Sequence, residues 1–404
     1  MNFDLSKQLE LFFGKLTSLA NRPGLIPAVF GLVFFANVII SLIPAKFIAS
    51  NPFQNLFLID SKSYLCEAWR RAGLSIQAQN FALDQIGRVY GGEGMTCDYL
   101  INSQYPGAPI FSRLLFITPI QVASLIQPIW GPLFLHFVFL GVFFFSALRI
   151  VGFASPQIKF AILLFFSNPS IVYPIFAFST EKYQLLLITY LLVLISSSGR
   201  SKKRTQAKFY IAISSLMLLR ENFVWGLFFC FCVFFTKRGG YSALRVIPTA
   251  SLSLFFSIIQ STFSRLNTPR DLTAYGGDRD FTEFQAAKRL FSHEAADLLN
   301  KSFCADLRVL FANFTIFDLL TILSLTFVIL EYVKRRDLIF PFLGLFLLSL
   351  GLAMDMFSAA FFNGDNVVTF FRLLLPSYWA ILILFALNRE ACWMISKKRP
   401  DRSS

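Results

Sequence analysis

Charged residues are scarce in this chain. They make up 15% of its 404 residues, while 55% are hydrophobic; a typical soluble domain has about 25% charged residues. So low a charge content excludes an ordinary soluble domain. Apolar runs of about 20 residues recur along the chain, and such runs are typical of helices that cross a membrane. We therefore predict an all-α, polytopic integral membrane protein.

Histidine and cysteine are also rare, with two and six residues. His136 and His293 are far apart in the sequence, and no set of residues has the spacing of metal ligands. We expect neither a metal nor any other cofactor, and a lone histidine is more often structural than a ligand. Cys66 and Cys97 share one expected outer loop and can pair there.

The net charge of +14 comes from basic clusters between the apolar runs. Examples are Arg200-Ser-Lys-Lys-Arg204, Lys334-Arg-Arg336 and Lys397-Lys-Arg399. Short loops with such clusters stay in the cytoplasm. The basic charge is thereby explained without a nucleic-acid partner, and we expect none.

These clusters predict ten spans with both termini in the cytoplasm, in a bacterial inner or plasma membrane. The expected spans are 25–47, 131–150, 157–177, 180–198, 206–219, 222–236, 243–261, 313–333, 338–357 and 367–388. We interpret 110–128 as a re-entrant or interfacial helix, because a crossing there would place the later basic clusters outside. Residues 1–404 then form one transmembrane domain, with outer loops at 48–109 and 262–312.

The stretch from Asp60 to Ala72 carries five charged side chains just after the first apolar run. Read as a helix, it places four polar side chains at offsets 0, 4, 7 and 11 on one face: Asp60, Tyr64, Glu67 and Arg71. Its apolar face is expected to rest on a membrane surface and contains Leu65, Ala68, Trp69 and Ala72. In the simpler interpretation, Asp60 only caps an interfacial amphipathic helix.

Further charged groups fall on the expected outer side. They are Glu181 and Lys182 at the start of a span, Arg220 and Glu221 in a shallow turn, and Asp365 and Arg372 near the last span. A charge inside the bilayer costs roughly 2.5–3.5 kcal/mol, so such groups pair or line a polar cavity. Either the neighbouring acidic and basic side chains simply form ion pairs with each other, or they line a cavity that binds an anionic lipid headgroup. In the second case, basic groups would hold a phosphate and a carboxylate would act as general base.

Several short motifs occur in a recognisable order. They are Asp60, Tyr64 and Ala68; Tyr105-Pro-Gly-Ala-Pro109 with Arg113; Asn168-Pro-Ser-Ile171 followed by Ser179-Thr-Glu181; Arg220-Glu-Asn222; and Arg372-Leu-Leu-Leu-Pro376. In this order they resemble the GT-C superfamily of membrane glycosyltransferases. The resemblance is greatest to the mannosyltransferases related to the second one of glycosylphosphatidylinositol assembly.

The resemblance implies an inverting transfer of a hexose, mannose-like, from a polyprenyl-phosphate donor. The acceptor would be a lipid-linked or surface glycan on the outer side of the membrane. Membrane lipids would surround the protein. Asp60 would be the catalytic base, and Arg220, with Arg113 or Lys182, would hold the lipid phosphate without a metal. The remaining expected substrate-binding residues are Tyr64, Glu67, Arg71, Glu181 and Arg372.

Two other classes of protein use similar residues. A surface polysaccharide polymerase or ligase would depend on arginines in the 262–312 loop, such as Arg265, Arg270 and Arg279. A lipid-linked sugar transporter would move the substrate without catalysis. Transporters are often built from repeated halves, and the sequence contains no internal repeat.

Overall fold

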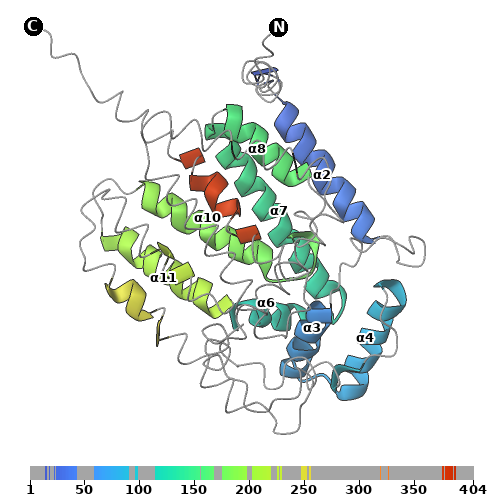
Figure 1. Ribbon diagram of the computed structural model, residues 1–404. Helices are drawn as coiled ribbons and strands as arrows, with labels where there is room; N and C mark the ends of the chain where they lie inside the picture. The colour runs from blue at the N-terminus through green and yellow to red at the C-terminus, as the bar shows by residue number, and fades with distance from the viewer. Residues whose placement is uncertain are drawn as a thin grey trace, which may run out of the picture.

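In the computed structural model, helices and the turns and bends between them make up the described part of the chain. The described residues are 14–15, 18, 22, 24–42, 59–90, 96–98, 114–154, 156–167, 175–197, 203–219, 225–226, 228–229, 247–252, 254–255, 319, 326, 375–376, 378–384 and 386–387. No strand occurs within them (Figure 1). The expected all-α class is therefore confirmed for this part of the chain.

The helices are α2 (Leu25–Leu42), α3 (Ile59–Arg71), α4 (Ile76–Tyr90), α6 (Leu114–Ile126), α7 (Trp130–Phe153), α8 (Pro156–Ser167), α10 (Glu181–Ser197) and α11 (Lys203–Leu219). They range from the 12 residues of α8 to the 24 residues of α7, and the two most polar ones, α3 and α4, follow each other. α8 is described as far as Ser167, and residues 177–180 form a bend before α10. Residues 168–174, in the C-terminal part of the predicted span 157–177, lie outside the described residues.

The main hydrophobic core lies among α2, α7, α8, α10 and α11, with the 375–387 segment beside α10 (Figure 1). Several phenylalanine rings pack within it; the ring of Phe143 lies 5.9 Å from that of Phe166 and 5.4 Å from that of Trp379. The Trp379 indole Nε1 donates a 2.8 Å hydrogen bond to Oγ1 of Thr189 in α10. This bond satisfies a buried polar group and ties the C-terminal part of the chain to the bundle.

α7 is the one described helix that is both long and apolar enough to cross a membrane, over Trp130–Gly152. Shorter apolar helical segments are Leu25–Ala36, Leu115–Ile126 and Gln206–Leu219. At 1.5 Å per residue, the 24 residues of α7 span about 36 Å, against a hydrocarbon core of about 30 Å. The 13 residues of α6 span only about 20 Å, so α6 is too short for a straight crossing.

α3, α4 and α6 lie together at one end of the long helices (Figure 1). α3 ends in a Schellman motif, in which Gly73 N donates to Arg70 O and Leu74 N donates to Trp69 O. Gly73 has φ +79°, a conformation that favours glycine. α4 then begins at once, because Ser75 Oγ accepts a hydrogen bond from Ala78 N. The two helices are thus joined by a short, well-defined turn.

A tight turn joins α6 to α7. Gln127 Oε1 accepts hydrogen bonds of 2.7 and 2.6 Å from the backbone nitrogens of Ile129 and Trp130 at the start of α7. Gly131 approaches the end of α6 so closely that a Cβ there would overlap the carbonyl oxygen of Ala123. Both features hold α6 against α7 at a fixed angle.

Substitution of Gly131 by Ala should therefore destabilise the protein. We expect a loss of about 1–3 kcal/mol, the usual cost of overpacking, and a lower midpoint of thermal unfolding in detergent. Gly141→Ala is the matched control, since a Cβ at this position of α7 meets no atom within 4 Å. It should leave stability unchanged or raise it by up to about 1 kcal/mol. Equal effects of the two substitutions would contradict the described turn.

Candidate functional site

The apolar face of α3 is buried against protein. Leu65, Ala68 and Trp69 are 1% exposed or less, and α3 packs on α6. Trp69 Nε1 donates a 2.8 Å hydrogen bond to Pro128 O in the α6–α7 turn. The expectation that this face rests on a membrane surface is wrong: an amphipathic pattern does not distinguish lipid from another helix.

A disulfide joins Cys66 of α3 to Cys97, confirming that the two cysteines pair. Both cysteines are fully buried, and Cys97 N donates a 2.8 Å hydrogen bond to Oδ1 of Asn80 in α4. The bond therefore fixes the 96–98 segment beside α3 and α4. It lies directly next to Glu67, so it also holds the polar face of α3 in place.

Removing the disulfide should destabilise this end of the protein. The double variant Cys66→Ala/Cys97→Ala opens a loop of 31 residues, and loss of a native disulfide typically costs about 2–5 kcal/mol. Thermal unfolding with and without dithiothreitol measures the effect. The wild type should lose stability on reduction while the double variant does not respond. A wild type that is insensitive to the reductant under unfolding conditions would contradict this role.

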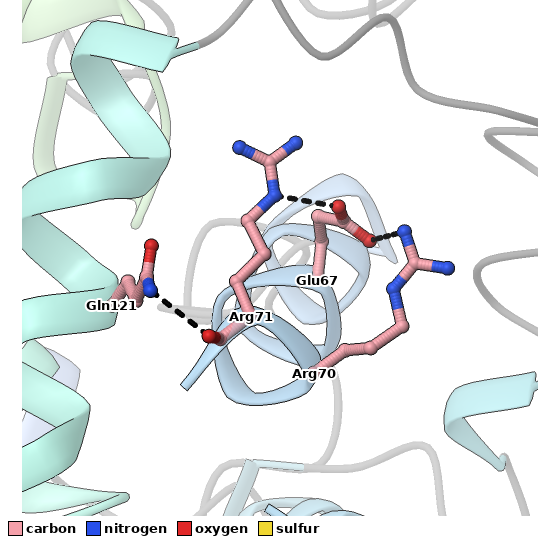
Figure 2. A network of polar contacts seen from close by, with 4 residues as sticks. All are labelled: Glu67, Arg70, Arg71 and Gln121. Atoms are coloured by element: carbon pink, nitrogen blue, oxygen red, sulfur yellow. Dashed lines mark hydrogen bonds and ion pairs between the residues drawn. The ribbon is translucent and has the colours of Figure 1, made fainter. Parts of the chain in front are cut away.

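The polar face of α3 carries a carboxylate held between two guanidinium groups (Figure 2). Glu67 Oε1 accepts from Arg71 Nε at 2.7 Å, and Glu67 Oε2 lies 2.6 Å from Arg70 Nη2. The expected proximity of Glu67 and Arg71 is therefore confirmed. The Glu67 and Arg71 side chains are 5% and 17% exposed, against 57% for Arg70, so the inner ion pair is the shielded one. Gln121 of α6 donates to the Arg71 carbonyl oxygen at 2.9 Å, which anchors the end of α3.

The guanidinium of Arg71 has a terminal nitrogen that remains available. Its Nη2 atom is buried and makes no hydrogen bond within the described residues. Figure 2 shows the terminal nitrogens of Arg71 pointing away from Glu67. A guanidinium that is fixed through Nε and has a terminal nitrogen without a partner in the described residues can bind an anionic oxygen. Eleven residues separate Asp60 from Arg71, which corresponds to about 16 Å along the helix axis, so one phosphate does not reach both positions.

Asp60 lies in the first turn of α3, as expected, and its side chain lies outside the described part of the structure. One turn later, Tyr64 is buried, with its ring 5.1 Å from that of Phe116 in α6. Between them, burial lowers the pKa of the Lys62 ammonium, because desolvation disfavours its charged form. The N-terminal half of α3 therefore faces protein.

Glu181 and Lys182 begin α10 and are both fully buried. Lys182 Nζ donates hydrogen bonds of 3.1 and 2.9 Å to the carbonyl oxygens of Ala177 and Ser179. It also lies 5.0 Å from the ring centroid of Tyr183, within the range of a cation–π contact. Lys182 thus stabilises the bend before α10. An ammonium has three donors, so one remains for another acceptor beyond the two bonds found in the described residues.

A buried aromatic cluster links α3 to the start of α10, although the two segments are far apart in the sequence. The Phe116 ring lies 5.1 Å from Tyr64, 5.2 Å from Tyr183 and 6.0 Å from Phe178. Leu219, at the end of α11, belongs to the same cluster. The structure therefore brings together Tyr64 and the Glu181–Lys182 pair, which we selected separately from the sequence.

Three predicted phosphate-binding arginines, Arg113, Arg220 and Arg372, lie outside the described residues. Sequence reasoning missed Phe116, which joins the two halves of the site, and gave no role to His136 of α7. Phenylalanine is so frequent in this chain, with 51 residues, that no local pattern singles out Phe116. The sequence offered one signal for His136, namely that the chain has only two histidines. Within the described residues, no three His, Cys, Asp or Glu side chains are placed to hold a metal ion.

No family model, curated protein or solved structure matches this chain.

Proposed function

We propose that the protein is a polytopic membrane glycosyltransferase that transfers a hexose from a polyprenyl-phosphate donor to a glycan or lipid-linked acceptor on the outer side. One observation carries this proposal. Tyr64, one turn from Asp60, and Tyr183, which directly follows the buried Glu181–Lys182 pair, belong to a single aromatic cluster around Phe116. Acidic and basic groups from two segments thereby gather at one end of an apolar helical bundle.

The exposed face of α7, which points away from the protein core, supports a location within a membrane. An exposed apolar stripe runs along this helix at spacings of three and four residues: Trp130, Phe134, Val138, Val142 and Phe145. On α2, Leu32, Phe35 and Ile39 are also at least 60% exposed. Contiguous apolar surface of this extent is unfavourable in water and favourable against lipid tails, so these faces are suited to contact lipid.

The disulfide supports an outer location for α3. Disulfides persist in oxidising compartments and are rare in the cytosol. Because Cys66 lies within α3, the polar face with Glu67 and Arg71 lies on the same side of the membrane as the disulfide. The substrate would then be a lipid-linked sugar whose phosphate lies at the outer leaflet.

In this reaction the Asp60 carboxylate would accept the proton from the attacking acceptor hydroxyl. The hydroxyl oxygen bonds to the anomeric carbon of the hexose as the bond from that carbon to the phosphate oxygen breaks, so the lipid phosphate leaves as an anion. A cation stabilises the developing charge. Lys182 is a described cation that lies against this cluster, with its Nζ 6.0 Å from the ring centroid of Phe178 and 5.0 Å from that of Tyr183. Arg71, about 16 Å from Asp60 along α3, would instead bind another anionic part of the lipid-linked substrates.

A donor screen tests this proposal. The purified protein in lipid nanodiscs is incubated with polyprenyl-phosphate hexoses and a membrane glycolipid extract, and the release of polyprenyl phosphate is followed. We expect time-dependent release from at least one donor together with a labelled acceptor. Movement of intact donor across liposomes without any release would instead identify a transporter and contradict the proposal.

A further inference from the structure

His136 is a buried histidine to which the proposed reaction assigns no role. Its side chain is 1% exposed in α7, and its ring lies 5.1 Å from Phe137 and 5.4 Å from Phe178. The backbone of Phe176 lies within hydrogen-bond reach of one ring nitrogen, but neither Nδ1 nor Nε2 makes a hydrogen bond of good geometry to any described residue. A buried polar atom without a partner costs about 1–3 kcal/mol, so this imidazole is suited to a partner from outside the chain.

The neighbours of His136 belong to the candidate site. Lys182 is close enough for its charge to act on the imidazole, and its Nζ lies 6.0 Å from the centroid of the same Phe178 ring. Thr180 Oγ1 is also buried without a hydrogen-bond partner within the described part of the chain. Phe178 contacts Phe116, whose ring in turn contacts Tyr64 of α3. The unpaired groups thus lie beside the aromatic cluster that joins α3 to α10.

The chemistry of these groups narrows the class of ligand. A neutral imidazole offers one donor and one acceptor, and a hydroxyl is likewise both. A hydroxyl partner therefore suits either nitrogen, whereas a carboxylate suits only a donor and an ammonium is repelled by Lys182. Aromatic rings provide apolar surface for the C–H faces of a sugar, and ligand sites combine such surface with a few polar groups.

We propose that His136, beside Phe178, binds hydroxyl groups of a neutral hexose unit of the substrate. The proposal rests on the proposed function, because it places the hexose close to Lys182. The hexose belongs either to the polyprenyl-phosphate donor or to the acceptor glycan, and both present the same hydroxyl chemistry.

The test compares His136→Phe with the wild type in three binding measurements. The probes are polyprenyl-phosphate mannose, polyprenyl phosphate without a sugar, and methyl α-mannoside. Phenylalanine keeps a ring in an apolar environment and removes both unpaired nitrogens, so thermal stability without ligand should stay equal or rise. If the hexose belongs to the donor, the Kd for polyprenyl-phosphate mannose should rise about tenfold or more, while the Kd for polyprenyl phosphate stays constant.

If the hexose belongs to the acceptor, affinity for methyl α-mannoside should fall by a similar factor while donor affinity is unchanged. Unchanged affinity for both hexose ligands would overturn the inference and leave His136 a structural residue. Should His136→Phe fail to fold, His136→Leu provides the same comparison, because leucine also removes both ring nitrogens. Loss of hexose binding in a protein that never releases polyprenyl phosphate would support this inference and contradict the transferase proposal. Normal transfer by a His136→Phe protein with unchanged hexose affinity would support the transferase proposal and contradict this inference.

Discussion

Replacing Asp60 by Asn is expected to lower sugar transfer about 100-fold or more while donor binding is kept. A positioned general base typically contributes about 10²- to 10⁴-fold to a rate, and Asn does not accept the proton. Asp60 lies in the first turn of α3, one residue after Ile59, where loss of the carboxylate charge costs at most about 1 kcal/mol through the helix dipole. The substitution therefore separates catalysis from a purely structural role, for which its effect should be small.

The measurement is the initial rate of polyprenyl-phosphate release at saturating donor, together with donor Kd and the midpoint of thermal unfolding. Asp84→Asn is the matched control, since Asp84 is a partly exposed acid of α4 that pairs with Arg88 at 2.7 Å. The control should transfer sugar at the wild-type rate, because surface ion pairs contribute at most about 1 kcal/mol. A fully active Asp60→Asn protein would exclude Asp60 as the base.

Replacing Trp69 by Ala is expected to have the largest effect on stability. The indole is fully buried between α3 and its neighbours, and truncating a buried Trp typically costs about 3–5 kcal/mol. The variant also leaves the Pro128 carbonyl oxygen without its hydrogen bond from Nε1. Since α3 carries Asp60, its undocking should abolish transfer as well. Thermal unfolding in detergent, with transfer measured well below the midpoint, separates the two effects.

Two controls make this test specific. Trp69→Phe keeps most of the buried surface and loses only the hydrogen bond, so it should cost about 1–2 kcal/mol. Phe81→Ala removes a large ring that is 67% exposed on α4 and should change protein stability little. If Trp69→Ala were as mild as Phe81→Ala, α3 would lie on lipid, as the sequence alone suggested, rather than on α6.

Local features of the site could be predicted because sequence spacing determines them. The i,i+4 relation of Glu67 and Arg71 places them on one helix face whatever the fold, and their ion pair is present. The apolar runs likewise predicted the helices of the main core, such as α7 and α10.

The long-range features could not be predicted, for a physical reason. An apolar helix face buries equally well against lipid or protein, so nothing local reveals that Trp69 meets the α6–α7 turn. Phe116 joins Tyr64 to Tyr183 only after α6 has folded between α3 and α10. The separation of Asp60 and Arg71 was available from the helical rise of 1.5 Å per residue. It shows that a shared helix face does not imply a shared ligand.

Photo-crosslinking tests the central claim most directly, namely that α3 and the start of α10 face one lipid-linked sugar. The purified protein in nanodiscs is irradiated with a polyprenyl-phosphate hexose that carries a diazirine on the sugar, and the labelled peptides are mapped by mass spectrometry. We expect labelling both within 59–71 and within 175–185, suppressed by excess unmodified donor. Labelling confined to the exposed stripe of α7, or labelling that unmodified donor does not suppress, would contradict the account.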